Sequence, residues 1–260
     1  MNLDLSNKNA LVCGSTQGIG LATALVLAEM GATVWLLARD KNKLREILPK
    51  LSTSLGQKHQ FLCADFSDIE QVKEVANTIS TLSIHILINN TGGPAAGPIK
   101  DAKVEAFEKA FSMHLLCNQL LTQAVLKHMQ SSCFGRIVNI ISTSVKVPIN
   151  GLGVSNTIRG AVASWSKTMA NELGEHGITV NNVLPGFTNT NRLTSLISKK
   201  ASAQNQTEEA IAQQMLASVP AQRFGEAQEV ANAIAFLCSP AAGYINGINL
   251  PVDGGRTGTL

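Results

Sequence analysis

The stretch that decides the fold is CGSTQGIG, residues 13–20, which joins a short apolar run to a segment of helical character. Its glycines, Gly14, Gly18 and Gly20, have the spacing G-x-x-x-G-x-G. Glycines between a strand and a helix let the chain turn tightly, let a phosphate approach the backbone and let the helix pack closely on the strand. The turn therefore predicts a dinucleotide-binding site.

Short apolar runs rich in β-branched residues alternate with longer helical segments along the rest of the chain. We expect strands at residues 9–13, 33–38, 60–64, 84–89, 136–141, 178–184 and 248–253. We expect helices at residues 19–30, 41–55, 67–82, 104–130, 153–173 and 227–238. This alternation predicts parallel strands that are buried on both faces. The expected fold is a single α/β domain over residues 1–260, a doubly wound Rossmann-type sheet of about seven strands flanked by helices.

Composition argues against several classes of protein. The net charge is only +3, and 15% of the residues are charged, which does not suit a nucleic-acid-binding surface. The N-terminus does not resemble a secretory signal, and no apolar run reaches the roughly 20 residues of a membrane span. No histidine or cysteine spacing suggests a metal site or disulfides, so we expect a cytoplasmic protein. The cysteines are Cys13, Cys63, Cys117, Cys133 and Cys238.

One segment, residues 188–218, interrupts the alternation. It is polar, rich in Ser, Gln, Lys and Ala, and too long for a simple connection. Because ligands of such sheets bind beyond the carboxyl ends of the strands, we interpret this insert as a substrate-covering lid, which together with residues 94–100 lines the substrate pocket. The alternative is a surface helical hairpin with no role.

Further motifs follow the other expected strands in order. They are Asp65, NNTGG at residues 89–93, Ser142, PGFTNT at residues 185–190 and VDGG at residues 252–255. With the glycine turn, they resemble the short-chain dehydrogenase/reductase family over nearly the whole chain. The stretch VPAQRFGEAQEVANAIAFLCSP, residues 219–240, is similar to its 3-oxoacyl-acyl-carrier-protein reductase branch.

This resemblance implies an oxidoreductase that interconverts a carbonyl and a secondary alcohol, with a small-molecule carbonyl or acyl-thioester substrate. It also implies a homotetramer or homodimer, with the helices at residues 104–130 and 153–173 at an interface, although their apolar faces also suit the core of one chain. The cofactor-binding residues that it implies are Gly14, Ser15, Thr16, Gly18, Ile19, Gly20, Arg39, Asp65, Phe66, Asn90, Arg159, Pro185, Gly186, Thr188 and Thr190.

The end of the second expected strand indicates which nicotinamide cofactor is bound. An acidic residue there hydrogen-bonds the adenosine ribose and repels a 2′-phosphate, but this chain has Ala38 followed by Arg39. An arginine fork pairs well with a phosphate, so the sequence favours NADP(H) over NAD(H). Alternatively, Arg39 is a solvated surface charge beside Asp40. Gln17, where NADP-dependent relatives often carry a basic residue, adds no support.

The family resemblance implies four catalytic residues. A serine binds the carbonyl oxygen, a tyrosine gives it a proton, a lysine lowers the tyrosine pKa and holds the ribose, and an asparagine anchors a water. Ser142 matches the serine, whereas the tyrosine position falls on Ser155, the lysine position on Arg159 and the asparagine position on His114. The single tyrosine of the chain, Tyr244, lies in a different motif.

These replacements leave three interpretations open. A serine hydroxyl is a poor acid and an arginine keeps its proton, so a working reductase needs an altered proton donor. In the first interpretation His114, expected to titrate near pH 7, supplies the proton, unless it is simply a core residue. In the second, the protein is a weak or inactive cofactor-binding sensor or subunit. In the third, Arg159 polarises an anionic substrate, such as a carboxylate or an enolate, in another oxidoreductase or elimination reaction.

Overall fold

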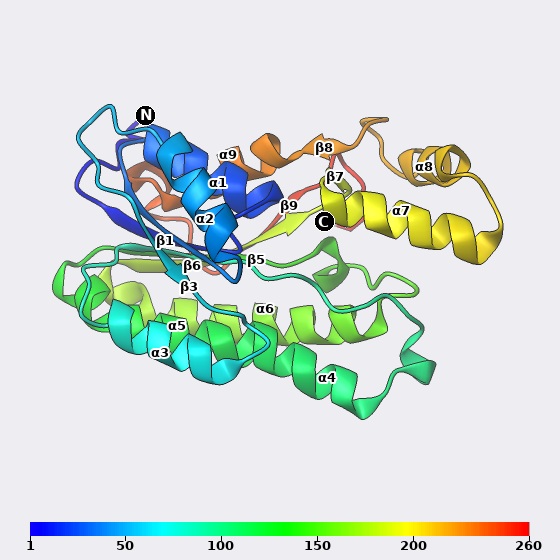
Figure 1. Cartoon of the computed structure of the whole chain (residues 1–260), viewed down its shortest axis with the longest axis horizontal. Helices are drawn as coiled ribbons and strands as arrows, with labels where there is room; N and C mark the ends of the chain where they lie inside the picture. Colours follow the sequence, from blue (N-terminus) through cyan, green and yellow to red (C-terminus); the bar gives the residue numbers. More distant parts are fainter. Residues whose placement is uncertain (260) are drawn as a thin grey trace.

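The computed structural model describes residues 1–259, which fold around one sheet of seven parallel strands (Figure 1). The order across the sheet is β3-β2-β1-β4-β5-β6-β9, which is a Rossmann-type order and confirms the predicted fold class. The strands are β1 (Asn9–Cys13), β2 (Thr33–Ala38), β3 (Gln60–Cys63), β4 (Ile86–Asn89), β5 (Gly135–Ile140), β6 (Ile178–Pro185) and β9 (Asn249–Val252).

The strand order reverses at β1, which pairs with β2 on one side and with β4 on the other. The chain builds the sheet outward from β1 to β3 and then crosses back to add β4, β5, β6 and β9. The connections that leave the carboxyl ends of β1 and β4 therefore diverge. A crevice at such a switch point is the usual ligand site of an open α/β sheet.

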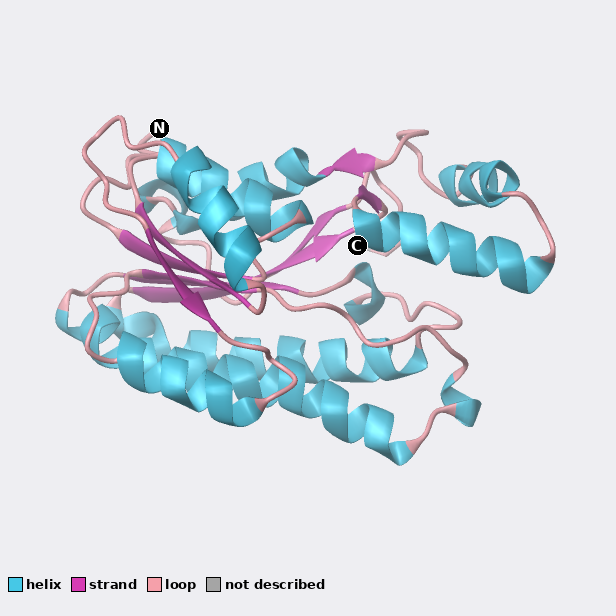
Figure 2. Ribbon diagram, viewed as in Figure 1, coloured by secondary structure: helices cyan, strands magenta, loops and turns pink. Residues whose placement is uncertain are grey.

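Helices cover both faces of the sheet (Figure 2). One layer holds α1 (Gly18–Glu29), α2 (Lys41–Ile47) and α9 (Ala227–Cys238), and α1 packs against α9. The other layer holds α3 (Ile69–Ile79), α4 (Val104–Phe111), α5 (Cys117–Ser131) and α6 (Gly153–Leu173). Short 3-10 turns are η1 (Leu48–Lys50), η2 (Ile99–Asp101), η4 (Thr143–Val145), η5 (Gly174–His176) and η6 (Pro240–Ala242).

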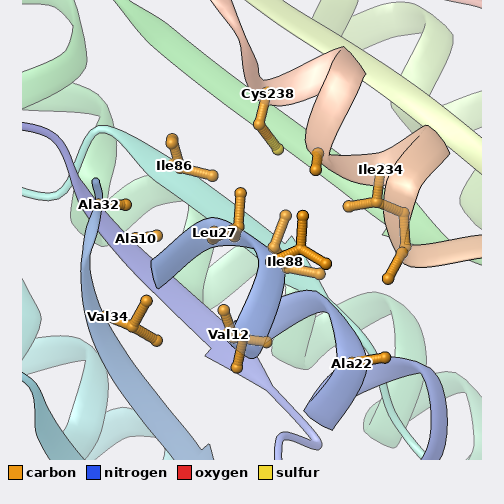
Figure 3. Close-up of a cluster of buried hydrophobic side chains, with 14 of the residues drawn as sticks. Ala10, Val12, Ala22, Leu27, Ala32, Val34, Ile86, Ile88, Ile234 and Cys238 are labelled. Atoms are coloured by element: carbon orange, nitrogen blue, oxygen red, sulfur yellow. The ribbon is translucent and has the colours of Figure 1, made fainter. Parts of the chain in front are cut away.

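The core explains why the central strands are apolar on both faces. Val12 and Ile88 point toward Leu27 of α1 and Ile234 of α9, as Figure 3 shows, and all four side chains have no exposed surface. Leu11 faces the opposite layer and is equally buried. Both sets of side chains leave water on folding, so the alternation of polar and apolar residues that is typical of a half-exposed strand is absent.

A ladder of asparagines crosses the buried middle of the sheet, which the apolar pattern does not predict. Asn89, Asn139, Asn182 and Asn249 are register partners on β4, β5, β6 and β9. Their amides form a chain of hydrogen bonds of 2.8–2.9 Å from Asn89 through Asn139 and Asn182 to Asn249. Buried amides that satisfy one another in this way fix the register of neighbouring strands.

Two of the expected helices differ from prediction. The helix expected at residues 41–55 ends at Ile47, because Pro49 has no backbone N–H to donate and instead opens the 3-10 turn η1. The helix expected at residues 104–130 is interrupted by η3, a π-helical turn at Ser112–Leu116. Turns of this kind occur frequently at functional sites. None of the helices in residues 1–259 is long and apolar enough to cross a membrane.

The insert at residues 188–218 forms a helical hairpin at one end of the sheet. Its helices are α7 (Asn191–Gln204) and α8 (Glu208–Leu216), which pack on each other and project beyond β6 and β9 (Figure 1). Two short strands, β7 (Thr188–Asn189) and β8 (Gly225–Glu226), tie the base of the hairpin together. A small apolar cluster that includes Leu193, Ile211 and Met215 holds it.

Candidate active site

The glycine turn after β1 packs closely against Asn90 at the end of β4. Gly14 and Gly18 have φ of +59° and +54°, which L side chains rarely adopt. A Cβ on Gly14 would stand 2.7 Å from the Asn90 carbonyl oxygen, and a Cβ on Gly20 would collide with the Gly14 carbonyl oxygen. The Asn90 amide donates to the carbonyl oxygens of Cys13 and Gly14, both at 3.3 Å. Only glycine fits where the two loops meet.

The N-terminus of α1 is free to bind an anion. Its N-cap residue, Gln17, is extended and makes no side-chain capping bond, and the first turn has no acidic residue. By contrast, α2 and α3 begin with Asp40 and Asp68, whose carboxylates accept from backbone N–H groups. The free N–H groups and the helix dipole at Gly18 therefore suit a phosphate. The glycine cradle, formed by Gly14, Gly18 and Gly20, presents no side chains. Together with these N–H donors, it fits the diphosphate of a dinucleotide.

Arg39 lies just beyond β2, where the sequence places the 2′-phosphate of the cofactor. Its guanidinium is 3.8 Å from the Asp65 carboxylate, and its side chain is 77% exposed. Hydrogen bonds from the backbone and hydroxyl of Ser67 are the main reason that the Asp65 pKa is lowered, with burial opposing and Arg39 contributing less. An exposed ion pair of this length contributes ~0–1 kcal/mol, so Arg39 can exchange it for a phosphate at little cost.

The other predicted cofactor residues lie at the carboxyl ends of three strands, β1, β3 and β6. Ser15 is fully buried, and its hydroxyl donates to the Leu37 carbonyl oxygen at 3.4 Å, so this hydroxyl faces the sheet. Thr16 follows it in the turn, Ile19 lies in the first turn of α1 and Phe66 lies after β3. Pro185 ends β6, and Gly186 and Thr188 lead from it to Thr190. The Thr190 methyl group lies 3.2 Å from where a Cβ on Gly18 would stand, so this loop reaches the glycine turn.

Ser142 follows β5 and opens the 3-10 turn η4. Its Oγ accepts from the Ser144 backbone N–H at 3.1 Å, which orients the hydroxyl and leaves its hydrogen available to a carbonyl oxygen. Ser155 lies in the first turn of α6 and is half-buried. Tyr244 is fully exposed beyond η6, and its neighbour Gly243 lies close to Arg136 at the start of β5. This tyrosine is therefore at the amino-terminal side of the sheet, opposite Ser142.

His114 lies in the π-helical turn η3 and is only 2% exposed. Its Nδ1 is hydrogen-bonded to the Thr91 hydroxyl, in the loop after β4. Burial, and secondarily the charge of Arg159, lower the His114 pKa to about 2. The expectation that His114 titrates near pH 7 is therefore wrong, because a buried imidazole beside a cation stays neutral.

Arg159 is a buried cation at the centre of the site, with 8% of its surface exposed. Its Nη1 donates to the Ile140 carbonyl oxygen at the end of β5, at 3.1 Å. Burial, followed by the charge of Arg192, lowers the Arg159 pKa to about 10, so the side chain remains protonated at neutral pH. Arg159 thus places a fixed positive charge beside the strand that leads to Ser142.

The sequence analysis missed Arg192, in the first turn of α7. Its Nη2 donates to the Pro94 carbonyl oxygen at 2.9 Å and therefore joins the loop after β4 to the insert. The only signal in the sequence was its place two residues after Thr190. A cavity of about 260 Å³ also lies beside the loop after β5, lined in part by Thr143, Ile149, Ser218 and Arg256. Of the segments expected to line the substrate pocket, only the insert contributes to this cavity, through Ser218.

The fold and the glycine cradle define a Rossmann-type domain with a dinucleotide site, and comparison with known proteins agrees. The family described as enoyl-(acyl carrier protein) reductase matches residues 14–257. A 3-oxoacyl-acyl-carrier-protein reductase of Vibrio harveyi is 33% identical, over 97% of this chain and 98% of its own. A tropinone reductase homologue of Arabidopsis thaliana is 32% identical, over 97% of this chain and 91% of its own.

Solved structures are similar over the full length of the chain. L-sorbose reductase from Gluconobacter frateurii, solved with NADPH and L-sorbose, has a TM-score of 0.92 and 28% identity, and each chain is covered completely. YwfH, an NADPH-dependent reductase of bacilysin biosynthesis, has a TM-score of 0.92 and 27% identity, over 98% of this chain and all of its own. The chain belongs to the short-chain dehydrogenase/reductase family and is an oxidoreductase of that type.

The neutral state of His114 predicts how stability depends on pH. The unfolded chain takes up a proton at His114 below pH 6.5 and the folded chain does not, so the free energy of unfolding falls as the pH falls. From pH 6.5 to 5 this loss is ~1.5 kcal/mol. We expect His114→Asn to lose ~1.5 kcal/mol less of its free energy of unfolding than the natural protein over this pH range, as measured by urea unfolding. The contribution of His85, whose pKa burial lowers to about 4, should remain in the variant.

The matched control is His176→Asn, since that side chain is 39% exposed. The same series on this variant shows how much of the change comes from a histidine-to-asparagine replacement at an accessible position. If His114→Asn and the natural protein lose stability equally between pH 6.5 and 5, then His114 is not held neutral by the fold.

Proposed function

We propose that the protein is an NADP(H)-dependent oxidoreductase that interconverts a carbonyl and a secondary alcohol. The glycine cradle at Gly14 and Gly20, the uncapped N-terminus of α1 and the loosely paired Arg39 support this cofactor. So do relatives whose structures hold NADPH or NADP, such as the L-sorbose reductase. When bound, the nicotinamide supplies the hydride that adds to the carbonyl carbon.

The buried charge of Arg159 carries the proposal for the chemistry. We infer that the Ser142 hydroxyl donates a hydrogen bond to the carbonyl oxygen and keeps its proton, with the Ser144 N–H holding the serine in place. Arg159 stabilises the negative charge that develops on this oxygen, because a fixed cation in a dry site interacts strongly with a forming alkoxide. The 2′-phosphate, adenosine and diphosphate of the cofactor are assigned to Arg39, Asp65 and the glycine turn respectively.

The proposed proton supply differs from that of the family. We assign Ser155 to the position of the acidic tyrosine in the family, and a serine hydroxyl does not ionise near neutral pH. His114 is neutral, so it can relay a proton from water between its two ring nitrogens but cannot store one. Loss of a positioned acid costs on the order of 10² to 10⁴ in rate, so we expect slow turnover.

The second candidate is a weak or inactive cofactor-binding subunit or sensor. One observation favours it: the single tyrosine, Tyr244, is fully exposed at the opposite side of the sheet and cannot replace the missing acid. The insert at residues 188–218 is proposed as the lid over the substrate in the first candidate. In the second candidate, it would report cofactor binding.

NADPH oxidation with a short 3-oxoacyl thioester tests the two candidates. We compare the natural protein with Ser155→Tyr/Arg159→Lys, and with Thr157→Tyr as a control that adds a tyrosine at an exposed position of α6. Turnover by the natural protein, raised ~10²-fold or more in the double variant, supports the altered proton supply. Turnover by the double variant alone supports the inactive subunit. Absence of NADPH binding would contradict both.

Arg39 predicts the cofactor preference. Charge-assisted hydrogen bonds contribute ~1.5–3 kcal/mol, so Arg39→Ala should weaken NADPH binding ~10- to 100-fold and NADH binding much less. Arg45→Ala removes another exposed arginine of the same region, in α2, and serves as the control. Equal losses for both cofactors, measured by calorimetric titration, would refute the role of Arg39.

We also propose a homodimer or homotetramer formed through α4, α5 and α6. Val104, Phe111 and Leu116 are 68%, 40% and 39% exposed along α4 and the π-helical turn, and exposed apolar side chains in a row favour a protein partner. Light scattering should give the mass of a dimer or tetramer, and Phe111→Glu should shift it toward one chain. A natural protein that is monomeric at micromolar concentration would contradict this proposal.

A further inference from the structure

Two arginines converge on Gly93, in the loop after β4. The Arg192 and Arg159 Nη2 atoms lie 3.4 and 3.9 Å from the point where a Cβ on Gly93 would stand. They come from different elements, α7 and α6, and each guanidinium has one hydrogen bond to a backbone carbonyl oxygen, that of Pro94 or Ile140. The mutual repulsion of the two arginines contributes to the lowered pKa of Arg159.

No carboxylate compensates these two charges within residues 1–259. Two other arginines, Arg39 and Arg223, make ion pairs with Asp65 and Glu229. Neither Arg159 nor Arg192 has an acidic partner among the described residues. The remaining titratable group beside Arg159, His114, is neutral. A buried cation without a counter-charge is costly, and a second cation beside it raises that cost. Such an arrangement is expected where an anion is to be bound.

The backbone beside the two arginines carries no side chain at Gly92 or Gly93. A Cβ on Gly92 would meet nothing within 4 Å, and the three atoms nearest to a Cβ on Gly93 all belong to the two guanidinium groups. The backbone N–H groups of both glycines donate to no acceptor within the described residues. Unpaired backbone N–H groups and planar guanidinium forks are donors that suit the two oxygens of a carboxylate.

We propose that Arg159 and Arg192, with the Gly92–Gly93 backbone, bind the carboxylate of an anionic carbonyl compound, so that the substrates are oxo acids. This inference rests on the proposed function and specifies its substrate class. In the reduction, the ketone carbon gains a hydride from the nicotinamide cofactor, and its oxygen gains a proton from water. The two electrons from the nicotinamide end in the new C–H bond, and the product is a hydroxy acid.

The position of the arginines favours a substrate carboxylate over the cofactor diphosphate. The diphosphate has its own donors at the glycine turn and the N-terminus of α1. Arg159 instead donates to Ile140, two residues before Ser142, and Arg192 donates to Pro94, in the loop after β4. An anion held at Gly93 would therefore lie on the Ser142 side of the crevice, where the carbonyl is proposed to bind.

The test compares acetoacetate with methyl acetoacetate, which carry the same ketone and differ in charge. Both are titrated by calorimetry into the natural protein, with and without saturating NADP⁺. We expect acetoacetate to bind at least ~10-fold more tightly than the ester, because charge-assisted hydrogen bonds contribute ~1.5–3 kcal/mol. Arg192→Met should abolish most of this preference, and Arg192→Lys should retain part of it because the charge stays but the fork is lost.

Lys199→Met is the matched control, since it removes a positive charge from an exposed position farther along α7 and should keep the preference. Arg192 is itself exposed, so its replacement is not expected to unfold the chain. Equal binding of acid and ester to the natural protein, or no binding of either, overturns the inference. So does a ~10-fold loss of NADP⁺ affinity in Arg192→Met with the acid preference intact, since Arg192 would then hold the cofactor diphosphate. Failure of the natural protein to bind NADP⁺ refutes the proposed function instead.

Discussion

The close approach of the β1 turn to the end of β4 is the constraint on which the site depends. Gly14 and Gly20 leave no room for a Cβ, and Asn90 is bonded across this contact to the carbonyl oxygens of Cys13 and Gly14. The contact lies at the point where the strand order reverses. This contact holds the start of α1 next to the loop that follows β4. The glycine turn and Gly93 therefore belong to the same site.

Arg159 differs from the rest of the core because it carries a buried, unpaired charge, and this difference points to a functional role. Most buried side chains of the domain are apolar, and the buried asparagines of β4, β5 and β6 hydrogen-bond one another across the sheet. Arg159 is also buried, but it has a single carbonyl partner and a second arginine as neighbour. An unpaired buried cation destabilises the fold, so its presence indicates a role in binding or chemistry. The buried charge unites two interpretations of the sequence, an altered reductase and a site for anions.

The fold could be predicted from the sequence because the apolar patterns and the turn residues indicate the same strands and helices that the structure contains. The limits of β1, β2, α6 and α9 follow from apolar periodicity and from glycine and proline positions. The π-helical turn at Ser112–Leu116 was not predicted, because its contact through His114 with Thr91 joins residues far apart in the chain and leaves no local signal. The neutral state of His114 and the pairing of Arg192 with Pro94 were hidden for the same reason, since both arise between residues far apart in the chain.

The central claim is that the paired arginines at Gly93 hold the carboxylate of the substrate beside the nicotinamide site. A crystal structure of the protein with NADP⁺ and acetoacetate tests it most directly. We expect carboxylate oxygens within ~2.7–3.2 Å of nitrogen atoms of both Arg159 and Arg192, and the ketone oxygen at the hydroxyl of Ser142. Cofactor phosphate bound between the two arginines, or a carboxylate placed away from Gly93, would contradict the account.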